Sequence, residues 1–401
     1  MSRMNILVVC QYYYPEPFRV TDICESLVKR GHEVTVLTGL PNYPEGVVLK
    51  EYCDGNRREE LLNGVKVIRC YEVGRGSSKL KLLLNYLSYA TSATFKALLM
   101  KQKFDVVVVN QLSPVMMAIP AMAYKMKSKK KMLLYCLDLW PASLAAGGLR
   151  ESAIIFKLFY KISRWIYSYA DSILVTSSMF KGYFRDVLKI KETRIVHLPQ
   201  YAEDLFAVTS PKANEGENKS YHFVFAGNIG DMQSVETIIL AANELKSFEY
   251  VFFHIIGEGS RLEACKKLAE DLQVDGVSFY GRKPIEEMPY FYDMADAMLV
   301  TLKDNETMSY TLPGKVQSYM AAGKPIIGAI NGETRLVISK ANCGFTCKAE
   351  DYRALAQLVM NFCRSDEIEQ MGKNAQKFYL DNYSKDRFMV ALEEAILDLE
   401  V

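Results

Sequence analysis

Short, continuously apolar runs alternate with segments of helical periodicity along the whole chain. In the first half these runs predict strands at residues 5–10, 33–38, 65–70, 104–110, 132–137 and 172–177. Apolar runs without polar alternation are typical of strands that are covered on both faces, as in the parallel sheets of α/β proteins. We therefore expect the first half to form a doubly wound α/β domain.

The same alternation returns in the second half after a break. Residues 199–220 lose the periodicity and gain Pro, Gly, Asn and Ser, and further strands are predicted at 222–227, 250–257, 277–281, 297–302 and 325–330. These boundaries predict Rossmann-like domains at 1–200 and 221–375, a linker at 201–220, and C-terminal helices at 376–401 that pack back toward the first domain. Such sheets bind ligands at the carboxyl ends of their strands, so a site is expected in a cleft between the domains.

The composition is that of a cytosolic protein with more than one domain. Of the 401 residues, 50% are hydrophobic and 24% charged, which allows full cores. No apolar run reaches the ~20 residues of a membrane span, and the opening run predicts a strand rather than a leader. The nine cysteines form no CxxC pair, as expected of reduced structural thiols without a metal. The net charge of +2 conceals 29 basic against 16 acidic residues in 1–200, and 20 against 31 in 201–401.

Two glycine-containing turns follow predicted strands of the second domain. Gly227 and Gly230 lie between a strand and a helix in the segment FAGNIGDMQSVE. Glycines let the backbone approach a ligand closely, and the start of the helix offers free N–H groups to an anion. Gly257 ends the next strand and begins a Gly-x-Gly without the full spacing of a dinucleotide-binding motif. The alternative for both segments is an ordinary turn between strand and helix.

The stretch PGKVQSYMAAGKPIIG (313–328) places a lysine in the first turn of a helix. Pro313 fixes φ near the helix start, Gly314 leaves the backbone open, and Lys315 follows. A cation at that position opposes the helix dipole unless an anion lies nearby. The segment thus indicates a site for an anionic ligand, and the alternative is that Lys315 points into solvent.

Nearly the whole chain resembles a known enzyme family. The stretch PGKVQSYMAAGKPIIGAINGET, followed by LVISKANCGF and DYRALAQLV, is similar to the donor-binding half of glycosyltransferase family 4. The segments NILVVCQYYYPEP, VKRGHEVTVLTGLPNYPEG, CLDLWPASL, LPQYAEDLF and AGNIGDMQSVE are similar as well. The resemblance is to the branch that builds bacterial surface polysaccharides, including colanic-acid enzymes and N-acetyl-L-fucosamine transferases.

The resemblance implies the GT-B fold, in which two doubly wound Rossmann-like domains face each other across a cleft. It also implies a retaining transfer without a metal or other cofactor, from a UDP-sugar held by the second domain to an acceptor held by the first. The implied donor-binding residues are Gly227, Asn228, Gly230, Gln233, Gly257, Arg282, Pro313, Gly314, Lys315, Val316, Gln317 and Ser318. The implied acceptor-binding residues are Tyr14, Glu16, Arg19, Asp138 and Trp140, and the implied catalytic residues are Asp138, Lys315 and Glu16.

The chain departs from the family pattern at several donor positions. Many members carry two glutamates eight residues apart, where this chain has Tyr310 and Ser318. The Arg and Lys that usually follow the first glycine of the second domain are replaced by Asn228 and Gln233. These changes remove charges from the expected donor site.

The remaining groups must then recognise the nucleotide. Lys315 and Arg282 are expected to neutralise the diphosphate, and Gln317 or Ser318 to bind the ribose. A departing diphosphate gains charge as the glycosidic bond breaks, and helix N–H groups with one lysine would stabilise this charge without a metal.

Two carboxylates of the first domain are candidates for the acceptor side. Glu16, in the loop QYYYPEPFR (11–19), is expected to orient an acceptor hydroxyl, and a surface carboxylate is the alternative. Asp138 follows a buried strand directly and is expected to position the acceptor or to take its proton, with a helix cap as the alternative. His32 is expected to be structural, in the turn before the second strand.

Two lysine-rich segments favour contact with a membrane surface. The segment KLKLLLNYLSYATSATFKALLMKQK (79–103) has five lysines and no acid, with leucines at helical spacing, and KMKSKKK (125–131) adds five lysines. A basic amphipathic helix of this kind is typical of contact with anionic lipid headgroups, whereas a core helix with a solvated edge is the alternative. We expect a cytoplasmic protein that associates peripherally with the inner face of the plasma membrane and binds no nucleic acid.

The sequence therefore predicts a retaining transferase of a sugar such as N-acetyl-L-fucosamine, acting on a polyprenyl-diphosphate-linked saccharide in capsule, O-antigen or exopolysaccharide synthesis. Because no second catalytic carboxylate is evident, a front-face mechanism is favoured, in which the leaving phosphate helps to deprotonate the acceptor. Two alternatives stay open. One is a UDP-sugar 2-epimerase of GT-B fold, and the other is a non-catalytic subunit that binds a partner or lipid.

Overall fold

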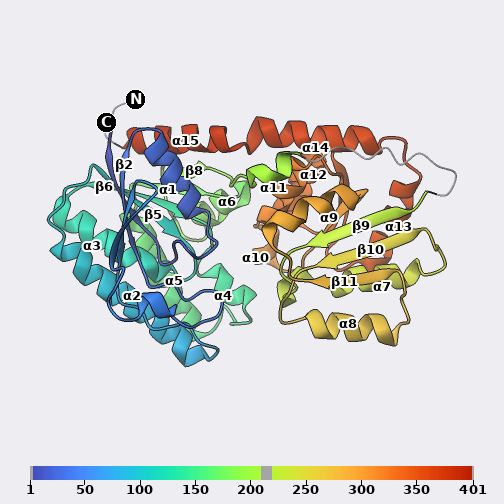
Figure 1. Ribbon diagram of the computed structural model, residues 1–401, viewed down its shortest axis with the longest axis horizontal. Helices are drawn as coiled ribbons and strands as arrows, with labels where there is room; N and C mark the ends of the chain where they lie inside the picture. Colours follow the sequence, from blue (N-terminus) through green and yellow to red (C-terminus); the bar gives the residue numbers. More distant parts are fainter. Residues whose placement is uncertain (1–2, 209–218, 400–401) are drawn as a thin grey trace. The chain divides into compact units, whose positions relative to one another are not determined.

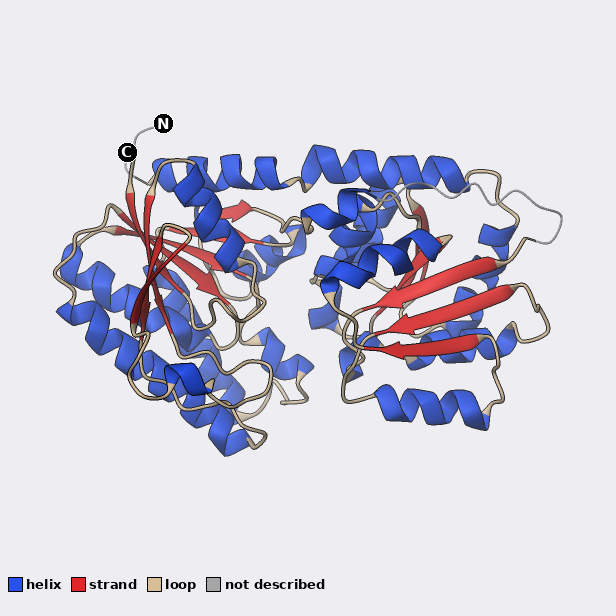
Figure 2. Cartoon of the chain, viewed as in Figure 1, coloured by secondary structure: helices blue, strands red, loops and turns tan. Residues whose placement is uncertain are grey.

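The computed structural model describes residues 3–208 and 219–399. The chain divides into two compact units, the first made of Met1–Leu198 with Met389–Val401 and the second of Pro199–Phe388. In each unit a layer of strands is flanked by helices (Figures 1 and 2). The expected linker at 201–220 thus falls in the second unit, and its residues 209–218 lie outside the described residues.

An eight-stranded sheet of order β3-β4-β2-β1-β5-β6-β7-β8 forms the centre of the first unit. Its strand pairs are parallel except for β3, which is antiparallel to β4. The strands are β1 (Asn5–Val9), β2 (Glu33–Thr38), β3 (Glu59–Leu62), β4 (Val65–Arg69), β5 (Val106–Gln111), β6 (Lys131–Cys136), β7 (Ser172–Val175) and β8 (Ile195–His197). Every residue of β5 is buried, as expected of a strand covered on both faces.

The helices of this unit connect the parallel strands. They are α1 (Val20–Lys29), α2 (Lys79–Leu99), α3 (Ile119–Ser128), α4 (Ala142–Ala146), α5 (Ile154–Tyr169) and α6 (Ser178–Asp186), with short turns η1 (Lys50–Tyr52), η2 (Val115–Ala118) and η3 (Glu192–Arg194). Helices α2 and α5 both contact α3 and η2, so they belong to the same helical layer. The strand order reverses between β1 and β5, which is where doubly wound sheets bind ligands.

The last described residues of the chain belong to this first unit. Helix α15 (Lys385–Leu397) carries Glu393, whose carboxylate accepts a hydrogen bond of 2.7 Å from Arg30 Nε and lies 3.0 Å from His32 Nε2. These contacts attach residues 389–399 to the turn between α1 and β2. His32 is buried in this contact, as expected of a structural histidine.

The second unit contains a fully parallel six-stranded sheet of order β11-β10-β9-β12-β13-β14. Its strands are β9 (Tyr221–Ala226), β10 (Val251–Ile256), β11 (Val277–Gly281), β12 (Ala297–Thr301), β13 (Ile326–Ala329) and β14 (Gly344–Cys347). Alternate residues of one strand enter different cores, Phe223 on one face and Val224 on the other. The sheet reverses its order between β9 and β12, so the expected doubly wound architecture is confirmed.

Eight helices and three short turns cover this sheet among the described residues. They are α7 (Glu236–Glu244), α8 (Leu262–Asp271), α9 (Met288–Met294), α10 (Glu306–Ser309), α11 (Gly314–Ala321), α12 (Gly332–Ala341), α13 (Tyr352–Cys363) and α14 (Ile368–Asn382), with η4 (Asp204–Val208), η5 (Asp231–Gln233) and η6 (Ile285–Glu287). The hydroxyl of Tyr319 on α11 lies 3.0 Å from both the N–H and the C=O of Ala226. This contact fixes the lysine-bearing helix against the carboxyl end of β9.

Candidate functional site

The loops at the carboxyl ends of β9, β10 and β12 are joined by backbone hydrogen bonds. Ile229 N–H, after β9, donates to Glu258 O after β10 over 2.8 Å. Lys303 N–H, after β12, donates to Met232 O over 3.0 Å. The three loops are therefore connected at the switch point of the second sheet, and we call them together the rim.

Glycine is required at two positions of this rim. Gly227 has φ of +139° and Gly257 has φ of +143°, where other residues are strained. A Cβ atom on Gly257 would lie 1.8 Å from Gly227 O, and Gly227 N–H donates to Ile256 O over 2.9 Å. The two turns are thus packed backbone to backbone, with no room for a side chain between them.

Lys315, in the first turn of α11, is the most unusual side chain next to the rim. Its aliphatic stem is partly exposed, whereas its Nζ atom is buried and has no hydrogen-bond acceptor among the described residues. Nζ lies 3.7 Å from the centroid of the Phe225 ring and within 2.8 Å of where a Cβ atom on Gly227 would be. Burial without a partner lowers the pKa of Lys315 to about 7. The Nζ atom therefore faces the Phe225 ring, without a hydrogen-bond acceptor among the described residues.

The first residues of α11 combine an open backbone with side chains that face inward. Pro313 precedes the helix, and a Cβ atom on Gly314 would meet nothing within 4 Å, so this end is open. Val316, expected to bind the donor, is fully buried in the core, and its N–H already donates to Pro313 O over 2.9 Å. Its side chain therefore has a packing role, which corrects that expectation.

Gln317 and Ser318, the expected ribose ligands, are also buried. With its amide nitrogen turned toward the acceptors around it, Gln317 donates to Pro313 O over 2.9 Å and to Gly314 O over 3.2 Å. Ser318 Oγ donates to Gly314 O over 3.4 Å. Both side chains stabilise the first turn of α11, and contact with a ribose would require them to leave these bonds.

Gln233 closes the loop after β9. Its Oε1 accepts hydrogen bonds from Gly230 N–H, at 3.2 Å, and from Asn228 Nδ2, at 3.0 Å. The two side chains that stand in place of the family's Arg and Lys therefore bond to each other. Arg282 follows β11, the edge strand, and is separated from β9 by β10. Lys315 is thus the cation closest to the Gly227 turn in this set.

A carboxylate that the sequence analysis missed lies near one of the absent glutamates. Tyr310 Oη donates to Glu306 Oε1 over 2.6 Å, one turn earlier along α10. Tyr310 therefore holds the carboxylate of Glu306 next to the position of one absent glutamate. A search for acids at helical spacing from Tyr310 would have found Glu306.

In the first unit, Glu16 is an internal support rather than an open acid. Its carboxylate accepts backbone hydrogen bonds from Asn42, Tyr43 and Tyr13, at 2.9, 2.8 and 3.2 Å. It is buried, and this burial raises its pKa to about 7. Glu16 thus links the loops after β1 and β2, which corrects the expectation that it faces an acceptor. In its loop Tyr14 is half exposed and Arg19 directly precedes α1.

Asp138 and Trp140 meet at a neighbouring loop. Asp138 Oδ2 accepts from Ser113 N–H over 2.9 Å, and Trp140 Nε1 donates to Ser113 Oγ over 2.8 Å. Burial raises the pKa of Asp138, and its bonds with Ser113 oppose this shift. The two residues therefore join the loops after β5 and β6, next to the switch point of the first sheet.

A buried acid that sequence reasoning missed lies at the same edge of this sheet. Glu72 Oε1 accepts from Gln11 Nε2 over 2.7 Å and from Asn85 Nδ2 over 2.6 Å. Burial raises its pKa to about 8. Glu72 follows β4 in a polar context, YEVGRG, that gives no signal of burial.

The lysine cluster at 125–131 has a structural role that the sequence did not indicate. Lys127 Nζ donates to Leu98 O and Met100 O, both over 2.6 Å, and so caps the end of α2. Lys125 contacts Tyr169 O and the carboxylate of Asp171. These lysines lie at the carboxyl ends of helices, where cations stabilise exposed carbonyls. Two lysines of the cluster therefore bond to helix ends, and contact of the cluster with a membrane stays a prediction.

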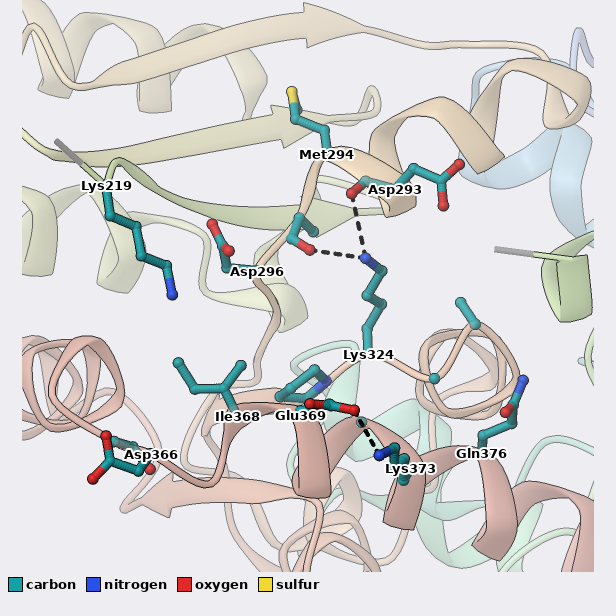
Figure 3. Close-up of a pocket in the computed structure, with 16 residues that line it drawn as sticks. Lys219, Asp293, Met294, Asp296, Lys324, Asp366, Ile368, Glu369, Lys373 and Gln376 are labelled. Atoms are coloured by element: carbon teal, nitrogen blue, oxygen red, sulfur yellow. Dashed lines mark hydrogen bonds and ion pairs between the residues drawn. The ribbon is translucent and has the colours of Figure 1, made fainter. Parts of the chain in front are cut away.

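A cavity of about 530 Å³ opens at the opposite edge of the second sheet (Figure 3). It lies against Asp296 and Pro325, which directly precede β12 and β13. Lys324 points to the backbone oxygens of Asp293 and Ala295, at 3.3 and 3.0 Å. This cavity is at the amino ends of the strands. The rim and Lys315 are at their carboxyl ends, so the two sites are distinct.

Comparisons with known proteins identify both units. Residues 18–200 match the model of the glycosyl transferase 4-like domain, and residues 209–378 match glycosyl transferases group 1. Across the described residues, no helix is both long and apolar enough to cross a membrane.

Relatives of this chain include a Pseudomonas aeruginosa protein named as glycosyltransferase WbjE. It is 29% identical over 280 residues, which cover 67% of this chain and 68% of that one. WcaI of Escherichia coli (strain K12), named for colanic acid biosynthesis, is 25% identical over 80% of this chain and 82% of its own length. The crystal structure of HepE from Anabaena in complex with UDP-glucose has a TM-score of 0.72 at 14% identity, covering 99% of this chain and 100% of that one. The chain therefore belongs to glycosyltransferase family 4, with the GT-B fold.

Proposed function

We propose that this glycosyltransferase moves a sugar from a UDP-sugar to a polyprenyl-diphosphate-linked saccharide, with retention of anomeric configuration. The observation that carries the proposal is the buried Nζ atom of Lys315, which lies beside the Gly227 turn without an acceptor among the described residues. A diphosphate matches an isolated ammonium group beside a helix start, because it offers several charged acceptor oxygens.

In the proposed reaction the bond between the anomeric carbon and the diphosphate oxygen breaks while the acceptor oxygen bonds to the same face of that carbon. The acceptor proton passes to the leaving phosphate, so no separate base is needed. Lys315 and the open start of α11 stabilise the charge that grows on the diphosphate. This scheme uses neither a metal ion nor a cofactor.

On the acceptor side, we assign Asp138 to orienting the acceptor hydroxyl. Its bond to Ser113 holds it at the switch point of the first sheet, and Trp140 is held by the same serine. Tyr14 and Arg19, at the loop after β1, are further candidates for acceptor contact. Glu16 supports this loop from within.

The donor and pathway are supported by similar proteins. HepE was crystallised with UDP-glucose, which favours a UDP-sugar here. The name of WcaI favours a surface polysaccharide as the product. Within that class an N-acetylated amino sugar such as N-acetyl-L-fucosamine is our candidate. We place the enzyme on the cytoplasmic face of the plasma membrane, where a lipid-linked acceptor would meet soluble nucleotide sugars.

Ligand-induced thermal stabilisation is the first test. The proposal expects UDP to raise the melting temperature of the wild-type protein and GDP to raise it less. A panel of UDP-sugars with a lipid-linked acceptor should then give free UDP and a glycosylated lipid by mass spectrometry. An epimerised nucleotide sugar without UDP release would identify the 2-epimerase instead, and no stabilisation by any nucleotide would identify a non-catalytic subunit.

A further inference from the structure

Helix α2 presents its large apolar side chains to solvent. Leu80, Leu83, Leu84 and Leu87 are between 45% and 67% exposed. The opposite face, which packs inside the unit, is lined by smaller or more polar residues: Asn85, Tyr89, Ala90, Ala93 and Ala97. A core helix would have the reverse arrangement. The leucines therefore form an exposed apolar stripe, and such stripes mark sites of interaction.

Helix α5 repeats this arrangement in the same helical layer. Ile154, Ile155 and Leu158 are more than half exposed, while Phe156 and Ile166 face inward. Both α2 and α5 contact η2 and α3, so the two stripes flank the same elements. We call the exposed leucines and isoleucines of 80–87 and 154–158 the α2–α5 surface.

The α2–α5 surface lies toward the carboxyl edge of the first sheet. Helix α2 begins in the loop that follows β4 and ends before β5, and α5 ends before β7. In such crossovers the first turns of a helix lie at the carboxyl ends of the strands. The apolar residues occupy these first turns, on the same edge as Asp138. Val47 is 69% exposed and adds a further apolar side chain near this surface. Its Cα atom lies 3.4 Å from where a Cβ atom on Gly74 would be, and Gly74 is close to the start of α2.

Charge indicates what this surface contacts. Neither helix contains an acidic residue. Lys79 and Lys81 of α2 and Lys157, Lys161 and Arg164 of α5 are exposed. Leucines and isoleucines bordered by cations match a bilayer with anionic headgroups. A symmetric second copy would instead bring like charges together.

We propose that the α2–α5 surface docks onto an anionic bilayer, with its apolar side chains in the headgroup–acyl boundary and its cations at the phosphates. The inference rests on the proposed function in one respect, since a lipid-linked acceptor explains why the edge that carries Asp138 faces a membrane. It differs from a purely electrostatic contact, because the leucines and isoleucines provide much of the binding.

Vesicle flotation tests this surface with the full-length protein. The wild type should float with vesicles of phosphatidylethanolamine and phosphatidylglycerol and much less with phosphatidylcholine. The variant Leu83→Gln/Leu84→Gln/Ile155→Gln should lose at least about tenfold in partitioning to the anionic vesicles. The control is Leu336→Gln/Leu380→Gln, which changes two leucines of the second unit with similar exposure, 60% and 55%. It should float like the wild type.

Three further results decide the outcome. Lys157→Gln/Lys161→Gln should weaken flotation at low salt and have less effect at high salt. Flotation of the triple variant at the wild-type level would overturn the proposal. So would a wild type that fails to float, and a dimer that the triple variant does not form would then identify a second copy of the chain as the occupant of this surface. Stabilisation by UDP is measured on every variant, so that failure of nucleotide binding is recognised separately from failure of membrane docking.

Discussion

A Cβ atom on Gly227 would lie 2.8 Å from the Nζ atom of Lys315, so the absent side chain leaves the space in which the ammonium group is held. Gly227 follows β9 directly and Lys315 lies in the first turn of α11. Tyr319 keeps the two elements in register through its contacts with Ala226. The position of the Lys315 ammonium group therefore depends on the absence of a side chain at Gly227. A substitution at either residue should affect the same contact.

Replacing Gly227 with alanine should lower both the melting temperature and the UDP affinity, whereas Gly314→Ala should change neither. The new methyl group would displace Nζ and impose a backbone strain of about 1–3 kcal/mol, because φ is +139°. A Cβ atom on Gly314 meets nothing within 4 Å. Melting temperatures and UDP affinities of the two variants provide the comparison. Equal UDP affinity in both would contradict the close contact.

Removing the ammonium group should separate stability from activity. We expect Lys315→Met to lower turnover at least ~100-fold, the scale of losing one oxyanion donor. Without ligand the same variant should be more stable at neutral pH, since it no longer buries a cation without a partner. Lys373→Met, which alters an exposed lysine of α14 paired with Glu369, is the control and should change neither property. Wild-type turnover in Lys315→Met would refute the role of this lysine.

Binding of UDP should depend on pH through Lys315. Its pKa is about 7 in the free protein, and a bound diphosphate raises it, so binding takes up a proton when the pH exceeds 7. The affinity should therefore fall by up to about tenfold per pH unit above pH ~7, until the pKa of the complex is reached. Calorimetry in buffers of different ionisation enthalpy measures this uptake. Lys315→Met should show no such uptake, and an unchanged slope in that variant would assign the proton to another group.

The acceptor role of Asp138 predicts a defect in transfer alone. Asp138→Asn keeps an oxygen that can accept from Ser113 N–H but removes the charge. Stabilisation by UDP should be unchanged, while transfer should fall at least ~100-fold, within the range of lost acid–base catalysis. Glu16→Gln provides the contrast, because its bonds are internal and the expected effect is a lower melting temperature. Loss of UDP binding in Asp138→Asn would contradict the assignment of Asp138 to the acceptor.

Glu72 should make stability depend on pH. Its pKa is about 8 in the folded protein against 4.5 for an ordinary glutamate, so the folded state binds the extra proton. The stability that comes from this group is present below pH 4.5 and is lost as the pH rises through 8. Glu72→Gln should therefore become more stable relative to the wild type as the pH increases over this window. Parallel unfolding curves for the two proteins at every pH would show that Glu72 does not titrate there.

The architecture could be predicted because buried parallel strands leave a clear trace in sequence. Continuous runs of β-branched residues such as VVVV in β5 are typical of strands buried on both faces. The strands that were missed lie at the edges of the sheets. β3 has only partly buried and exposed residues, β8 has three residues, and β14 is GFTC. Edge strands are covered less completely and lack the long apolar run.

The placement of Lys315 at a helix start could be predicted, but the orientation of the neighbouring side chains could not. The pattern placed Lys315 at a helix start, and the structure shows its Nζ atom beside Gly227. The sequence pattern did not show that the side chains of Gln317 and Ser318 bond to the backbone of their own helix. One helical turn contains both inward and outward positions, and the pattern does not distinguish them here. Periodicity was also ambiguous for α2. The leucines recur every three or four residues, but so do Asn85, Tyr89, Ala93 and Ala97, and it is the second set that packs inside.

The contact of Glu393 with Arg30 and His32 has a consequence for the order in which the protein forms. Glu393 and His32 are 361 residues apart in sequence but belong to the same unit. During synthesis, residues 30–32 therefore leave the ribosome long before α15, the helix that carries Glu393, has been made. A fragment that ends at residue 198 would therefore leave Arg30 without the carboxylate of Glu393 and would leave His32 uncovered.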